Sequence, residues 1–263
     1  DLDMLMATGL PTFCLALFEN TDGTPSRTVS QTIGPRLYSE SSIFGDFDSD
    51  GDLDIIATYS KEGTVVVYDN DDGKFDAGTE VFNDQRGRHC QRVYCIDIDK
   101  DGDQELFCAK GPWGPPGPSV ALAQTNSNTM EVIWKSSADT GFHGFDFRDV
   151  DNDGDLDLLV VNLVGQSDSL FVNQGGWFED ETGMSGLSSI SRPYTRFGVG
   201  YYDLNNDGTL DLYMANGKVV IGESSSRDDY YAEDNVLIQG IQGGTFKEVL
   251  PKGGVSQPLV HTS

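Results

Sequence analysis

One acidic nine-residue pattern recurs along the chain and constrains its fold more than any other feature. Four complete copies occupy residues 46–54, 97–105, 149–157 and 203–211, and their first residues are 51, 52 and 54 positions apart. Residues 1–3 match the last three positions of a fifth copy that is cut in the middle. A nearly constant period of this length is typical of a propeller, a solenoid or another repeat array.

Each period also carries the sequence of four β-strands. A β-type segment precedes each acidic loop, and a second follows it at residues 54–57, 106–109, 158–161 and 212–215. Hairpins with Gly-containing turns then follow at residues 17–23, 67–73, 170–176 and 237–243, with residues 121–129 in the corresponding place of the remaining period. Aromatic residues come soon after three of these turns, at Phe75, Phe178 and Phe246. Four strands in about fifty residues describe one propeller blade.

The sequence therefore predicts an all-β fold. The 31 Gly and 10 Pro leave no apolar stripe of helical period longer than two turns. We expect a β-propeller of about five four-stranded blades, with the acidic loops between the first and second strands. Residues 1–263 would form a single propeller region, with repeats at approximately 1–40, 41–91, 92–143, 144–197 and 198–263.

The acidic loops have the chemistry of calcium sites. Carboxylates at alternating positions, with Gly at position 6, suit a hard cation that takes six to eight oxygen ligands. Positions 1, 3, 5 and 9 offer side-chain oxygens and position 7 offers its backbone carbonyl. We expect about four Ca²⁺ ions, one for each complete loop. The candidate ligands are Asp46, Asp48, Asp50, Asp52, Asp54, Asp97, Asp99, Asp101, Asp103, Glu105, Asp149, Asp151, Asp153, Asp155, Asp157, Asp203, Asn205, Asp207, Thr209 and Asp211, with Asp1 and Asp3 in the cut copy.

Other interpretations of the loops fit less well. Solvated acidic turns would use Asp and Gly for turn chemistry alone, but they would not recur four times at one spacing. An EF-hand needs a bidentate Glu at position 12, where this chain has Ala57, Cys108, Val160 and Met214. Mg²⁺ demands a tighter octahedron, and Zn²⁺ prefers His or Cys ligands. Apolar residues at position 2, namely Phe47, Ile98, Val150 and Leu204, are expected to anchor each loop between buried strands.

The net charge of −26 limits the partners of the chain. A field of this sign repels the phosphates of nucleic acids and anionic lipids, so we expect neither partner. No apolar run approaches the roughly 18 residues that a membrane span needs. The loops and the cut copy hold 20 of the 43 acids, and these carboxylates repel one another without a cation. We therefore expect the fold to be much weaker in chelator.

The residues resemble a known family. An acidic loop after an aromatic-Gly strand, as at Phe44-Gly45 and residues 197–200, resembles the FG-GAP/VCBS repeat of integrin-α-type β-propellers. Residues 169–220 are most similar to the propeller region of the ASPIC/UnbV proteins, which are similar to cartilage acidic protein. The segments that carry this likeness are residues 170–173, 178–182, 186–187, 195–200 and 215–219. Glu105, Asn205 and Thr209 depart from the motif but keep oxygen donors, so they affect affinity alone.

The resemblance implies a propeller with more blades than this chain supplies, seven or eight in all. We expect the chain to be a fragment truncated at both ends and a partial ring of that propeller. No secretory signal peptide is visible in it. The resemblance also implies an extracellular or cell-surface location, where calcium is abundant.

The leading functional hypothesis is a non-catalytic, calcium-binding extracellular scaffold for protein or carbohydrate binding, as in cell adhesion. The alternative is a carbohydrate-active enzyme, similar to polysaccharide lyases, or a lectin on the same fold. A basic and aromatic pocket around Trp113, Arg148 or Arg196 would favour the alternative. The three His residues, at 89, 143 and 261, lie in no recognisable catalytic motif.

Two further features remain open at this stage. Cys95 and Cys108 flank the second acidic loop on strands expected to be neighbours, so they form either a disulfide or two buried thiols. The exposed loops that carry Trp113 and Tyr230-Tyr231 either contact a ligand or cover neighbouring strands.

Overall fold

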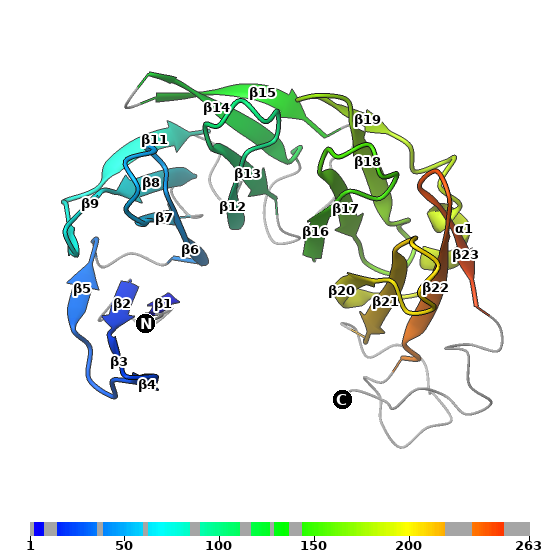
Figure 1. Ribbon diagram of the computed structural model, residues 1–263, viewed down its shortest axis with the longest axis horizontal. Coiled ribbons are helices and arrows are strands. Elements are labelled where there is room, and N and C mark those ends of the chain that lie inside the picture. The colour runs from blue at the N-terminus through cyan, green and yellow to red at the C-terminus, as the bar shows by residue number, and fades with distance from the viewer. Residues whose placement is uncertain are drawn as a thin grey trace. The chain divides into compact units, whose positions relative to one another are not determined.

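The computed structural model describes residues 3–7, 15–35, 39–59, 63–84, 90–110, 117–126, 129–136, 144–218 and 233–249. The chain divides into two compact units, Asp1–Gly141 and Phe142–Ser263. Each unit is built from antiparallel β-sheets, most of whose strands are labelled in Figure 1.

In the first unit, the second and third repeats each form a four-stranded antiparallel sheet. The strands of the second repeat, in their order across the sheet, are β6 (Ser41–Gly45), β7 (Asp54–Tyr59), β8 (Thr64–Tyr68) and β11 (Thr79–Asn83). Those of the third repeat are β12 (Arg92–Ile96), β13 (Glu105–Ala109), β14 (Val120–Asn126) and β15 (Thr129–Lys135). The acidic loops join β6 to β7 and β12 to β13, as the sequence predicts.

The first repeat forms a three-stranded sheet. Its strands are β1 (Met4–Ala7), β2 (Leu15–Phe18) and β5 (Gln31–Ile33), which correspond in order to β7, β8 and β11. Short hairpins made of two-residue strands extend the turns of the first and second repeats. In the first repeat β3 (Asn20–Thr21) pairs with β4 (Thr24–Pro25), and in the second β9 (Asn70–Asp71) pairs with β10 (Lys74–Phe75). The described part of this repeat therefore has one strand fewer than the four expected of each blade.

The second unit contains two more four-stranded sheets. The fourth repeat supplies β16 (Gly144–Arg148), β17 (Asp157–Val161), β18 (Ser169–Asn173) and β19 (Phe178–Asp180). The fifth supplies β20 (Arg196–Tyr202), β21 (Asp211–Asn216), β22 (Val236–Ile241) and β23 (Thr245–Glu248). A five-residue helix that the sequence does not predict, α1 (Leu187–Ser191), lies between them in the chain. The predicted all-β class is confirmed.

The strand that follows each acidic loop is the most deeply buried. Every residue of β7, β13 and β17 is buried. Cores form between consecutive repeats: Phe47 and Val67 pack with Val93 and Leu122 in the first unit, and Val150 packs with Tyr201 in the second. The apolar runs predicted as strands thus supply the packing between blades.

Gly45 explains the aromatic-Gly motif at the end of β6. A Cβ atom added there would lie 2.8 Å from Sγ of Cys95, on β12 of the next repeat. A side chain at this position would therefore push β6 and β12 apart. The glycine is required by this close approach.

The expectation for position 2 is wrong in one loop. Phe47, Ile98 and Val150 are buried, but Leu204 is 53% exposed. Phe47 and Val150 each pack against the repeat that follows in their own unit, whereas no sheet of the described residues follows the one that carries Leu204.

The two cysteines that flank the second acidic loop, Cys95 and Cys108, do not form a disulfide with each other. The disulfide joins Cys90 to Cys108, with 5.0 Å between their Cα atoms, and Cys95 is a free thiol. Register explains the difference, because Cys108 lies opposite Val93 and Cys95 lies opposite Leu106. The partner of Cys108 comes from just before β12.

Candidate metal centre

The backbone of each acidic loop follows one course. Position 4 adopts a left-handed conformation in every complete loop, with φ between 59° and 64° at Ser49, Lys100, Asn152 and Asn206. The glycine at position 6 has φ between 86° and 100°. In the first loop, Asp48 Oδ1 accepts a hydrogen bond from the N–H of Asp50, and Asp50 Oδ1 accepts one from the N–H of Asp52. These Asx turns curl the chain around one centre.

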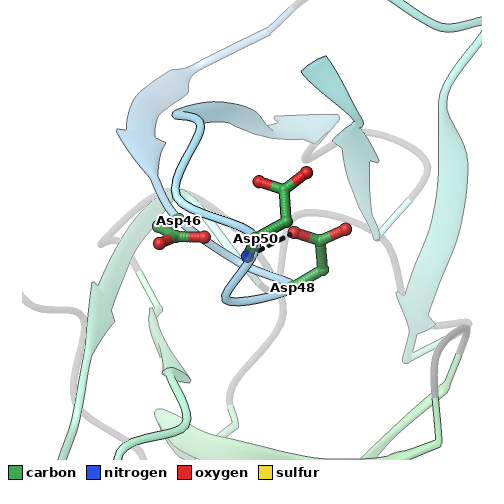
Figure 2. A group of neighbouring side chains, drawn as sticks. All are labelled: Asp46, Asp48 and Asp50. Atoms are coloured by element: carbon green, nitrogen blue, oxygen red, sulfur yellow. Dashed lines mark hydrogen bonds between the residues drawn. The ribbon is translucent and has the colours of Figure 1, made fainter. Parts of the chain in front are cut away.

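The loop curvature brings the carboxylates together. Oxygen atoms of Asp46, Asp48 and Asp50 lie within 4.8 Å of one another, and Figure 2 shows the three side chains around the turn after β6. Because Ca–O distances are about 2.3–2.6 Å, two ligands on opposite sides of one ion are about 5 Å apart. The spacing therefore matches a shared calcium ion. Groups in the second and third loops meet the same limit, Asp97 with Asp99 and Asp101, and Asp149 with Asp151 and Asp157.

The first residue of three loops has an unsatisfied oxygen. The Oδ1 atoms of Asp46, Asp97 and Asp149 are buried and accept no hydrogen bond. A buried carboxylate oxygen without a partner is costly, and a cation beside it removes that cost. The donor set of these loops thus fits a hard divalent ion.

Position 9 connects three of the four complete loops to the hairpin of their own repeat. Asp157 Oδ2 accepts a hydrogen bond from the N–H of Val150, and Oδ1 accepts one from the N–H of Asn173, both at 2.8 Å. Asp54 and Asp211 make the same pair of contacts. The remaining carboxyl at this position, Glu105, accepts the N–H of Ile98.

Asp3 has the position-9 contact to its hairpin as well. Its Oδ1 atom accepts the N–H of Asn20 at 2.9 Å, as Asp54 Oδ1 accepts the N–H of Asn70. This agreement supports the alignment of residues 1–3 with the end of an acidic loop. Asp1 lies outside the described residues.

Burial raises the pKa of several loop carboxyls. It raises the pKa of Glu105 to about 7, and repulsion from Asp99 and Asp101 adds to the effect. It raises the pKa of Asp157 to about 6, although two backbone N–H groups oppose the change. The loops therefore hold negative charge that is unfavourable without a cation.

The fourth loop differs from the others. Asp207 Oδ1 accepts hydrogen bonds from both the N–H and the hydroxyl of Thr209, and Asp207 Oδ2 accepts one from the amide of Asn205. Hydrogen bonding, chiefly from the Thr209 side chain, lowers the pKa of Asp207. Asp203, Asp207 and Asp211 are not among the acid groups within 4.8 Å of one another in the described residues.

The side chains at position 7 stay on the outside of the loops. Asp52, Asp103 and Asp155 are exposed or partly exposed. Asp155 Oδ2 accepts the N–H of Gly175 in the hairpin that follows β18. This placement is compatible with a ligand role for the position-7 backbone carbonyl, which stays a prediction.

Sequence reasoning missed Asp69. Its carboxylate lies within 4.8 Å of those of Asp48 and Asp54, although it directly follows β8 and is outside the loop. A pocket of about 350 Å³ opens beside these acids and is also lined by Asp76 and Val67. The signal in the sequence that could have indicated this residue is its position directly before Asn70, the asparagine of the hairpin.

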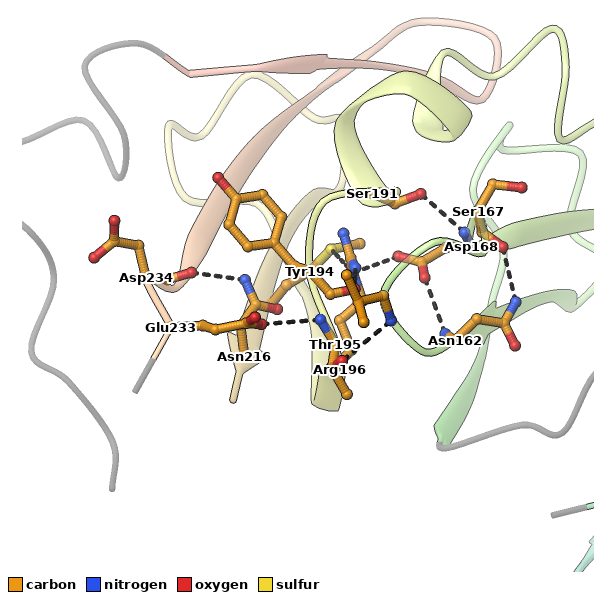
Figure 3. Close-up of polar contacts among 12 residues, drawn as sticks. Asn162, Ser167, Asp168, Ser191, Tyr194, Thr195, Arg196, Asn216, Glu233 and Asp234 are labelled. Carbon is orange, nitrogen blue, oxygen red and sulfur yellow. Dashed lines mark hydrogen bonds and ion pairs between the residues drawn. The ribbon is translucent and has the colours of Figure 1, made fainter. Parts of the chain in front are cut away.

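Arg196 does not contribute to a surface pocket. Its side chain is fully buried, and Nε lies 2.5 Å from Oδ2 of Asp168. Figure 3 draws this ion pair among the neighbouring polar contacts. Burial lowers the pKa of Arg196 and raises that of Asp168. A basic site around Arg196 is therefore excluded.

The remaining residues that the sequence raises for a ligand pocket are Arg148, Trp113 and the Tyr230-Tyr231 pair. Arg148 is exposed and donates from Nη1 to the backbone oxygen of Phe147. Trp113, Tyr230-Tyr231 and the three His residues lie outside the described residues.

Comparison with known proteins agrees with this architecture. Residues 46–108 and 149–214 match the model of the FG-GAP-like repeat, and these two segments contain all four complete loops. The four-stranded sheets and these repeats together support an FG-GAP repeat β-propeller. No curated protein matches the chain.

Two solved structures resemble the chain at low identity. One is an Agrocybe aegerita lectin described as recognising non-reducing terminal N-acetylglucosamine, with a TM-score of 0.56 and 16% identity. The alignment covers 93% of this chain and 60% of the lectin, so the chain spans less than two thirds of that protein. The other is the Tc holotoxin pore of Photorhabdus luminescens, with a TM-score of 0.42, 16% identity, and coverage of 98% of this chain and 12% of that one.

Among the described residues, no helix has the length and apolarity that crossing a membrane requires.

Proposed function

We propose that the chain is a calcium-stabilised, non-catalytic scaffold that binds glycans or proteins outside the cell. The observation that carries the proposal is the set of buried, unpartnered Oδ1 atoms of Asp46, Asp97 and Asp149, each beside further loop carboxylates. A divalent cation would satisfy these oxygens and offset the repulsion among the acids.

Calcium would be held by positions 1, 3, 5 and 9 of each loop, with the position-7 carbonyl. Its role would be structural, because position 9 also links the loop to the hairpin of the same repeat through backbone N–H groups. Binding energy at the loop would thereby stabilise the whole blade.

The location and the partner are supported by separate features. A buried disulfide between Cys90 and Cys108 fits an oxidising compartment. The propeller fold shared with a glycan-binding lectin favours a lectin as the specific form of this function. Kinship with the ASPIC/UnbV proteins, and the adhesion role that integrin-α-like propellers imply, belong to the same proposal.

Calcium titration tests the proposal. We expect calorimetry on chelator-treated protein to show about four bound ions, and the melting temperature to drop strongly in EDTA. Magnesium at equal concentration serves as the control and should restore little stability, because it prefers a tighter octahedral site. An unchanged melting curve with no ions bound would overturn the metal assignment.

A further inference from the structure

A pocket lies between the first and second repeats of the first unit. Its volume is about 330 Å³, at the lower end of the range of about 300–1,000 Å³ that is usual for small-molecule sites. The first repeat contributes Glu19 and Gln31, and the second contributes Phe44, Leu53 and Phe75. Both repeats therefore form its walls.

One side of the pocket is apolar. Phe44 and Phe75 are partly buried and pack against the core between the two repeats, which holds their rings in place. Leu53, at position 8 of the first acidic loop, is 52% exposed. Fixed aromatic rings beside an exposed aliphatic side chain suit a ligand that has one apolar face.

The other side offers hydrogen-bond acceptors. Within the described residues, no group donates to the carboxylate of Glu19. Gln31 Nε2 donates to the backbone oxygen of Gly73 at 2.8 Å, which orients the amide and leaves its Oε1 atom without a described donor. A ligand that donates several hydroxyl groups would satisfy both acceptors.

We propose that this pocket binds one pyranose unit of a neutral glycan. The inference rests on the proposed function and assigns a site and a ligand class to it. A pyranose ring combines a C–H face, which fits the apolar wall, with hydroxyl donors for Glu19 and Gln31. Glu19 and Asp3 line the pocket in a chain of net charge −26, so uronic acids and sulfated sugars are repelled.

A cation is a poorer fit than a sugar at this place. Glu19 does not belong to the described acid groups whose oxygens lie within 4.8 Å of one another. Asp3 already accepts the N–H of Asn20. The pocket also has more apolar wall than an ion site uses.

The test uses the full chain saturated with calcium. Saturation-transfer NMR and calorimetry would measure binding of the methyl glycosides of N-acetylglucosamine, galactose and glucose, with methyl glucuronide as the anionic probe. Glu19→Gln keeps the shape of the side chain but weakens a charged acceptor, and Leu53→Ala shortens the apolar wall. The matched controls are Glu179→Gln, at an exposed residue of β19, and Ile133→Ala, at a residue of β15 that is 45% exposed.

We expect a neutral glycoside to bind and methyl glucuronide to bind at least about tenfold more weakly. Glu19→Gln should weaken binding of the neutral probe about tenfold. Leu53→Ala should weaken it about threefold. Both controls should bind like the unmodified chain, and equal melting temperatures would show that every variant is folded.

The remaining outcomes separate this pocket from the broader function. Neutral binding that neither pocket variant changes would place the sugar elsewhere and overturn this site while leaving a glycan-binding scaffold. Absence of binding by every neutral probe, with calcium stoichiometry intact, would overturn the sugar assignment but not the calcium-stabilised scaffold. Equal binding of methyl glucuronide would overturn the neutral specificity.

Discussion

The Arg196 Nε atom lies 2.5 Å from Asp168 Oδ2, and neither side chain is exposed to solvent. Arg196 begins β20 in the fifth repeat, whereas Asp168 precedes β18 in the fourth, so the ion pair joins two sheets of the second unit. Asp168 Oδ1 also accepts the N–H of Asn162, and Arg196 Nη1 donates to the backbone oxygen of Tyr194. The contact is one of the polar links between these blades.

Removing one partner of this pair should destabilise the second unit strongly. Arg196→Met leaves the Asp168 carboxylate buried without its cation, so we expect a loss of about 3–5 kcal/mol in the free energy of unfolding. Adding Asp168→Leu should recover most of the loss. Urea unfolding with saturating calcium measures both, and Arg192→Met, at an exposed arginine, is the control. Equal, small losses in Arg196→Met and the control would contradict the prediction.

Position 9 and position 3 of the third loop should behave differently when replaced. Asp157→Asn puts an amide where two backbone N–H groups donate, so it should cost about 1–3 kcal/mol even in EDTA. Asp151→Asn removes the negative charge of a partly exposed candidate ligand and should lower calcium affinity with little effect in EDTA. Thermal unfolding with and without calcium distinguishes the two. If Asp157→Asn destabilises only the calcium-loaded protein, position 9 has no structural role of its own.

The sequence predicts the parts of this site that depend on local spacing. Alternating acids with a glycine at position 6 define the loop, and the apolar run that follows it defines the buried strand. These features need no knowledge of the rest of the chain. The loop course at Ser49 and Gly51, and the burial of β7, agree with them.

The parts that escape prediction depend on contacts between distant segments. Asp69 joins Asp48 and Asp54 only because the hairpin folds back over the loop. The pairing of Cys90 with Cys108 follows from the register of β12 against β13, which the sequence leaves open. Such contacts form only when the strands have paired and packed, so local spacing in the sequence does not reveal them.

The disulfide should stabilise the first unit measurably. Cys90 and Cys108 are 18 residues apart, so closing this loop is worth about 3 kcal/mol. We expect dithiothreitol to lower the melting temperature of the unmodified chain and of Cys95→Ala by the same amount. The double variant Cys90→Ala, Cys108→Ala should melt at the lower temperature with or without reductant. A shift that depends on Cys95 would contradict the assignment.

Stability without calcium should decrease as pH rises between about 4.5 and 7. Burial raises the pKa of Glu105 from 4.5 to about 7, so in this interval the folded chain binds more protons at this site than the unfolded chain. Calcium affinity at the second loop should increase over the same interval, because the ion displaces the proton. Urea unfolding in EDTA across this range measures the first effect, and Glu105→Gln should reduce it. A pH dependence unchanged in Glu105→Gln would show that other carboxyls cause it.

The fourth loop should bind calcium more weakly than the first three. Asn205 supplies no charge, and both oxygens of Asp207 are engaged by Asn205 and Thr209, so binding must break these hydrogen bonds. Asn205→Asp should raise its affinity at least about tenfold, since a further unit charge about 4 Å from the ion is worth several kcal/mol at an effective dielectric constant of about 20. Calorimetric titration should resolve one weak site that becomes tight in this variant, while Asp151→Asn should weaken a tight site instead. Four equal sites in the unmodified chain would contradict the prediction.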